Sequence, residues 1–121
     1  MSTTFFQLAF DAVHAGDLAQ FWAQATGGKV EDDASHDEAV VTGSDFPQMV
    51  FHRVPEGKTA KNRLHFDLIA ADYDSEVARL VGLGASKVNE LTSGGARWST
   101  LDARWSTLAD PEGNEFDVIA G

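Results

Sequence analysis

The sequence repeats one pattern of strands and helices, and no other feature limits the possible folds as strongly. When the chain is shifted by 58 positions against itself, a strand and a helix of the first half fall on a strand and a helix of the second. This shift places Gln7 on His65 and His14 on Asp72. Few residues are identical between the halves, so the inference depends on the shared pattern. We therefore expect two modules of the same fold.

Each half predicts one helix among several strands. In the first half, alternating or apolar runs predict strands at residues 5–12, 39–42 and 48–54. Apolar residues at helical spacing after the first strand predict an amphipathic helix with Phe21 and Trp22 on its buried face. Asp17 is positioned to cap this helix and Gly27 to end it. The second half predicts a helix at about 74–83 that stops at Gly84, and strands at 64–70, 87–91, 98–108 and 115–119.

A short tandem repeat lies within the strand predicted at 98–108. Residues 96–102 (ARWSTLD) are followed directly by a second copy at 103–109 (ARWSTLA). Because seven is an odd number, a straight strand through both copies would turn the inward residues of the second copy outward. We expect one copy to form the strand and the other to be extruded as a loop or bulge. A replication-slippage insertion at a surface hairpin explains the repeat without a function.

The composition excludes several classes of protein. Nineteen acidic and nine basic residues give a net charge of −10, which repels nucleic acid and anionic membrane surfaces. The chain has no cysteine, so any metal must be bound by nitrogen and oxygen ligands. No stretch approaches the roughly 20 apolar residues of a membrane span, and no basic, apolar leader opens the chain. A soluble, cytoplasmic protein is expected.

Three stretches resemble the glyoxalase/bleomycin-resistance/extradiol-dioxygenase superfamily, also called the vicinal oxygen chelate superfamily. They are Phe21-Trp22 on the predicted helix, residues 61–68 (KNRLHFDL) and residues 109–116 (ADPEGNEF). The most specific is the Asp-Pro-x-Gly-Asn turn that enters the last strand. The resemblance implies an α+β fold of two βαβββ modules whose curved sheets form a cup, with the helices outside. It implies a single glyoxalase-like domain over 1–121, with module 1 at about 1–58 and module 2 at about 59–121.

The resemblance also implies metal-binding positions on the first strand of each module and on the last strand. These positions hold Gln7, His65 and Asp117, where family members usually carry His, His and Glu. Internal symmetry adds His52, which is reached from Asp117 by removing the module offset and the seven-residue insertion. Such a quartet suits Zn, Ni, Fe, Co or Mn. A histidine beside Asp67 can equally be a hydrogen-bonded structural residue.

Strand alternation indicates which other side chains point toward a ligand. Asp67 shares a strand face with His65, and Glu115 shares one with Asp117. In the chemistry that the resemblance implies, the ion chelates two vicinal oxygens of the substrate and stabilises an enediolate or similar oxyanion. Asp67 and Glu115 are then the candidates to transfer the proton. The predicted lining of the ligand cup comprises Trp98, Trp105, Ile69 and Ile119.

Two functions from different classes follow. The first is a metal-dependent lyase, isomerase or dioxygenase that acts on a small, oxygen-rich metabolite. The second is a metal-free protein, similar to the bleomycin-resistance branch, that binds a small molecule or drug in the cup. His65 at the matching position favours the first, whereas the net acidity and the imperfect ligand set favour the second. The fold alone does not decide between them.

The predicted partners are a small molecule and a second copy of the chain, because the resemblance implies a homodimer. Nucleic acid and membranes are not expected as partners. The densest positive charge of the acidic chain lies at Lys58, Lys61 and Arg63. These residues can bind an anionic group of a substrate at the rim of the cup, or they can pair with surface carboxylates.

Overall fold

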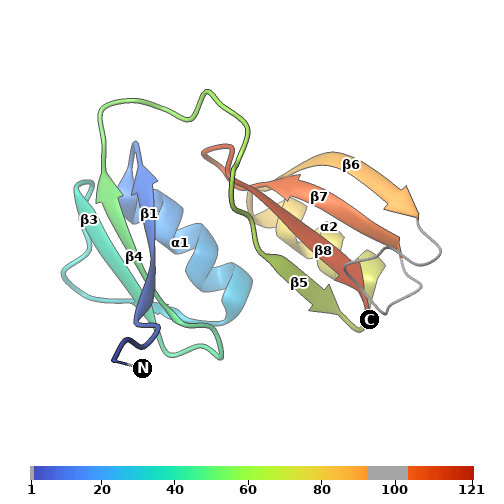
Figure 1. Cartoon of the computed structure of the whole chain (residues 1–121), viewed down its shortest axis with the longest axis horizontal. Coiled ribbons are helices and arrows are strands. Elements are labelled where there is room, and N and C mark those ends of the chain that lie inside the picture. Colours follow the sequence, from blue (N-terminus) through green and yellow to red (C-terminus); the bar gives the residue numbers. More distant parts are fainter. Residues whose placement is uncertain (1, 93–103) are drawn as a thin grey trace. The chain divides into compact units, whose positions relative to one another are not determined.

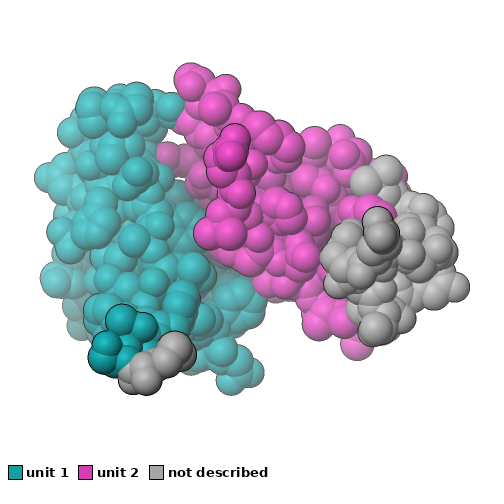
Figure 2. Space-filling view, viewed as in Figure 1, with its two compact units in different colours: residues 1–57 teal, residues 58–121 magenta. Residues whose placement is uncertain are grey.

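In the computed structural model, which describes residues 2–92 and 104–121, each half of the chain forms a four-stranded sheet with one helix along one face (Figure 1). The chain divides into two units, Met1–Gly57 and Lys58–Gly121 (Figure 2). Each unit has the element order βαβββ, so the predicted α+β fold of two βαβββ modules is confirmed. Neither helix is long and apolar enough to cross a membrane, in the part of the chain described.

Unit 1 builds a mixed sheet in which the first and last strands are neighbours. Its elements are β1 (Gln7–Ala12), α1 (Ala15–Thr26), β2 (Lys29–Val30), β3 (Glu38–Thr42) and β4 (Gln48–Arg53). The strand order is β1-β4-β3-β2, with β1 parallel to β4 and the other pairs antiparallel. A helix connects β1 to the rest of the sheet, as the parallel β1–β4 pair requires a long crossover.

Unit 2 repeats this topology. Its elements are β5 (Asp67–Ala70), α2 (Tyr73–Leu83), β6 (Ser86–Thr92), β7 (Arg104–Ala109) and β8 (Glu115–Ala120). The strand order is β5-β8-β7-β6, and β5 is parallel to β8. The second copy of the tandem repeat supplies β7, whereas the first copy, residues 96–102, lies outside the described residues.

Each helix covers an apolar sheet face. Phe21 and Trp22 on α1 are buried, as the helical spacing predicted. The Phe10 ring of β1 lies 5.9 Å from the Trp22 ring and 4.8 Å from the Phe51 ring of β4. In unit 2, Phe116 of β8 is buried and stacks on Phe66. The polar residues of the strands are therefore left for the opposite face of each sheet.

The prediction that Asp17 caps the first helix is wrong. The helix begins at Ala15, and His14 is its N-cap. The His14 Nδ1 accepts a hydrogen bond from the Asp17 backbone N–H at 3.1 Å, so the imidazole fills the role of a capping oxygen. At the equivalent place in unit 2, Asp72 caps α2 and accepts from the Ser75 backbone N–H at 3.3 Å. The module offset thus superposes the two caps.

The Asp-Pro-x-Gly-Asn stretch forms the turn that joins β7 to β8. Asp110 is buried, and its Oδ1 accepts from the backbone N–H groups of Glu112 at 2.9 Å and Asn114 at 3.0 Å. Its Oδ2 accepts from the Asn114 side-chain amide at 2.9 Å. Gly113 has φ 90°, a left-handed conformation that favours glycine. One buried carboxylate therefore holds the hairpin that carries β8.

Replacing Asp110 with alanine should destabilise the fold. The substitution leaves the turn N–H groups without their charged acceptor, and we expect a loss of about 2 to 3 kcal/mol in the free energy of unfolding. Asp110→Asn keeps a carbonyl oxygen and should lose about half as much. Urea denaturation followed by circular dichroism measures both. Pro111 is exposed, so Pro111→Ala is the control, and an Asp110→Ala midpoint equal to that of the control would contradict this role.

Candidate metal and ligand site

The strand register of unit 2 arranges the open face of its sheet in rows. Asp67 on β5 pairs with Asp117 on β8, which pairs with Thr107 on β7. Two residues further along, Ile69 pairs with Ile119 and Ile119 with Trp105. The alternate residues of β8, Phe116 and Val118, are buried on the face that α2 covers. A polar row and an apolar row therefore lie side by side on the face opposite the helix.

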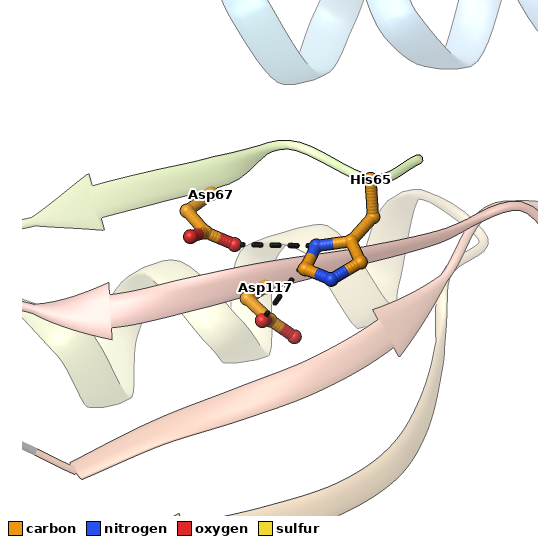
Figure 3. A group of neighbouring side chains, drawn as sticks. All are labelled: His65, Asp67 and Asp117. Atoms are coloured by element: carbon orange, nitrogen blue, oxygen red, sulfur yellow. Dashed lines mark ion pairs between the residues drawn. The ribbon is translucent and has the colours of Figure 1, made fainter. Parts of the chain in front are cut away.

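His65, Asp67 and Asp117 converge on this face (Figure 3). His65 lies just before β5, and its Nδ1 is 3.4 Å from Asp67 Oδ1 and 3.9 Å from Asp117 Oδ2. One nitrogen or oxygen atom from each side chain lies within 4.8 Å of the other two. The exposed fractions of the side chains are 45%, 38% and 13%. The group is thus reachable from solvent on one side and anchored at Asp117.

Thr107 orients the Asp117 carboxylate. Its Oγ1 donates to Asp117 Oδ1 at 2.7 Å, while Asp117 Oδ2 is the oxygen nearer His65. A hydrogen bond of this kind fixes a ligand side chain and leaves its second oxygen for an ion. Sequence reasoning missed Thr107. Its position two residues after Trp105, on the same strand face, could have identified it as a residue of the site.

The two predicted proton carriers have opposite electrostatic environments. Burial and the neighbouring Asp117 carboxylate raise the pKa of Asp67, although His65 opposes part of this effect. The Lys61 ammonium donates to Glu115 and lowers the pKa of that carboxyl. Asp67 therefore retains a proton more readily, whereas Glu115 stays ionised beside its lysine.

In unit 1, the register separates Gln7 from His52. Gln7 pairs with Gln48, whose Nε2 donates to Gln7 Oε1 at 2.7 Å, while His52 pairs with Asp11. His52 lies four positions beyond Gln48 on β4, about 13 Å along the strand. Side chains that stand on a sheet do not close such a gap around one ion. The register of unit 1 therefore does not bring Gln7 and His52 together.

The strand register gives Asp117 a different counterpart in unit 1 from His52, which the module offset gave. Ala9 pairs with Val50 in unit 1 in the same way that Asp67 pairs with Asp117 in unit 2. The structural counterpart of Asp117 is thus Val50, two residues before His52. Gln7 belongs to the other unit from His65, so its role as a ligand stays a prediction.

Three of the four predicted cup residues lie in the part of the chain that the structure describes. Ile69, Ile119 and Trp105 form the apolar row, in which Ile69 is 64% exposed and Ile119 is buried. Trp98 lies outside the described residues. Their role in binding a ligand stays a prediction.

Comparison with known proteins gives one family and many similar folds. Residues 7–119 match the family model described as glyoxalase-like domain. The fosfomycin resistance protein FosX from Listeria monocytogenes is 12% identical, with a TM-score of 0.75 over 100% of this chain and 95% of its own. A glyoxalase/bleomycin resistance protein/dioxygenase family enzyme from Burkholderia phytofirmans PsJN is 14% identical, with a TM-score of 0.70 over 94% and 95%. Lactoylglutathione lyase from Agrobacterium tumefaciens is 14% identical, with a TM-score of 0.64 over 100% and 96%. No curated protein shows significant sequence similarity.

Asp67→Asn should stabilise the protein at neutral pH when divalent ions are removed with a chelator. A raised pKa means that the folded state holds the Asp67 proton more tightly than the unfolded chain does. Its contribution is therefore fully present below the ordinary value of 3.8 and is lost as the pH rises through the higher folded value. The melting temperature of the variant should exceed that of the wild type at pH 7.5, and the difference should shrink toward pH 3.5. Asp33→Asn, on an exposed turn, controls for net charge, and an equal gain there would contradict the prediction.

Proposed function

The chain belongs to the glyoxalase-like domain family of the vicinal oxygen chelate superfamily, and from this premise we propose that it binds a small, oxygen-rich metabolite at a divalent metal ion held by His65, Asp67 and Asp117. The observation that carries the proposal is the convergence of three ligand atoms from these side chains within 4.8 Å of one another. A homodimer and a cytoplasmic location are part of the proposal, as the sequence predicts.

The three side chains fit a divalent ion. An imidazole nitrogen and two carboxylate oxygens are ligands that Zn, Ni, Fe, Co and Mn accept. Asp67 and Asp117 are paired on adjacent strands, so their charges repel, and a cation between them offsets this repulsion. Thr107 holds the second oxygen of Asp117 in place. Three protein ligands would leave coordination positions for a substrate.

We propose a lyase, isomerase or dioxygenase as the reaction class. A divalent ion at this place would supply Lewis-acid chemistry by polarising substrate oxygens. The apolar row of Ile69, Ile119 and Trp105 would contact the part of the substrate that carries no oxygen. With Asp67 used as a ligand, Glu115 is the predicted proton carrier that remains. Because Lys61 lowers the pKa of Glu115, this carboxylate is a weak base, so the geometry supports binding more strongly than catalysis.

A metal-free binding protein, as in the bleomycin-resistance branch, is the second candidate. The observation that favours it is that the His65 imidazole already contacts both carboxylates. The imidazole would then bridge the two carboxylates in place of an ion.

Metal content and metal-dependent melting separate the two candidates. We expect the wild type to hold near-stoichiometric metal and to melt at a higher temperature with Zn, Ni, Mn or Fe(II). An ion present at about 100 times its Kd stabilises a folded protein by about 2.7 kcal/mol. His65→Ala should lose both effects because it removes the only nitrogen ligand of the group. Inductively coupled plasma mass spectrometry and thermal melts measure them.

His52→Ala is the matched control, because His52 is an exposed histidine on the open face of the other sheet. It should behave like the wild type. If the wild type and both variants bind no metal and their melting temperatures do not respond to it, the proposed metal site is contradicted. The metal-free binding protein is then the better function.

A further inference from the structure

We infer that the ligand of this site is an elongated molecule with an anionic group at one end, chelating oxygens in the middle and an apolar or aromatic group at the other end. The inference rests on the proposed function and adds the substrate class. It comes from the order in which three kinds of side chain follow one another along β8 and its neighbours.

Alternate residues of β8 define the three zones. Glu115, Asp117 and Ile119 share the open face, and successive members are about 7 Å apart because a strand rises about 3.3 Å per residue. Around Asp117 lie the other two metal-binding candidates. The full set of zones therefore spans about 13 Å along the strand.

Two lysines lie at the zone of Glu115. The Lys61 ammonium pairs with the Glu115 carboxylate. The Lys58 Cδ lies 4.0 Å from the position that a Cβ on Gly113 would occupy, and Gly113 precedes Glu115 by two residues. Both ammonium groups lower the pKa of the Glu115 carboxyl. One carboxylate thus faces two cations in a chain whose net charge is −10.

This pair also leaves a lysine available to a ligand. The Glu115 side chain is 18% exposed, and its backbone N–H donates to Asn62 Oδ1 at 3.0 Å, so the carboxylate is held in place. The Lys61 side chain is 74% exposed. Because exposed ion pairs of this kind stabilise little, the ammonium can turn toward an incoming anion without a large loss.

The zone at Ile119 is apolar and open at one edge. Ile119 is buried between its strand partners Ile69 and Trp105, while Ile69 is 64% exposed. Covering this side chain with an apolar group removes its surface from water, which is favourable. A two- or three-carbon metabolite bound at the middle zone would reach neither end, so the zones select a longer molecule.

A chelating probe with both ends tests the inference. N-hydroxy-N-(phenylacetyl)-4-aminobutanoate has a hydroxamate between a phenyl group and a carboxylate. Its methyl ester lacks the charge, and its N-acetyl analogue lacks the ring. On the full chain loaded with Zn²⁺, isothermal titration calorimetry should show the probe binding about tenfold more tightly than either analogue.

Two exposed positions supply variants that report each end separately. Lys61→Gln should reduce the preference for the acid over the ester by about fivefold and leave the preference for phenyl over acetyl unchanged. Ile69→Thr should do the reverse. Both side chains are largely exposed, so folding should be retained.

Zn²⁺ titration without probe distinguishes failure of the metal site from failure of the elongated ligand. If Zn²⁺ binds but the wild type does not distinguish the three probes, or each variant changes both preferences alike, the elongated ligand is overturned and the metal site stands. If Zn²⁺ does not bind, the metal site fails and this inference fails with it.

Discussion

The parallel pairing of the first and last strands within each unit is the constraint on which the candidate site depends. In unit 2 it places Asp67 and Asp117 on adjacent strands, although they are far apart in the sequence. Paired strands lie about 4.8 Å apart, a separation at which two carboxylates and an imidazole can meet. The Asp110 turn then folds β7 against β8 and brings Thr107 to Asp117. The pairing of the backbone strands therefore sets the spacing of the candidate ligands.

Local periodicity allowed most of the fold to be predicted. The helical spacing of Phe21 and Trp22 and the alternation along β5 and β8 identified the buried and open faces. The cap of the first helix was missed because an aspartate is the commoner capping residue, so Asp17 was preferred. The imidazole of His14 accepts the same hydrogen bond three residues earlier. N-cap propensities alone do not predict that an imidazole takes the place of a capping oxygen.

The candidate site was predicted less completely, since it depends on strand register. The offset that superposes the first strands and helices gave His52, whereas the register of β1 with β4 makes Val50 the counterpart of Asp117. The second and third strands are separated by residues 31–37 in unit 1 and by the longer stretch 93–103 in unit 2, and a single sequence does not show how many extra residues belong there. The two identical copies of ARWSTL also did not indicate which threonine would reach Asp117.

The counterparts of Asp67 and Asp117 in unit 1 are Ala9 and Val50, so unit 1 lacks carboxylates at the two positions where unit 2 has them. All three converging groups belong to unit 2. Their spacing is set by hydrogen bonds between neighbouring strands, so a hinge motion at residues 57 and 58 would leave it unchanged. The spacing of the three candidate ligands therefore depends on unit 2 alone.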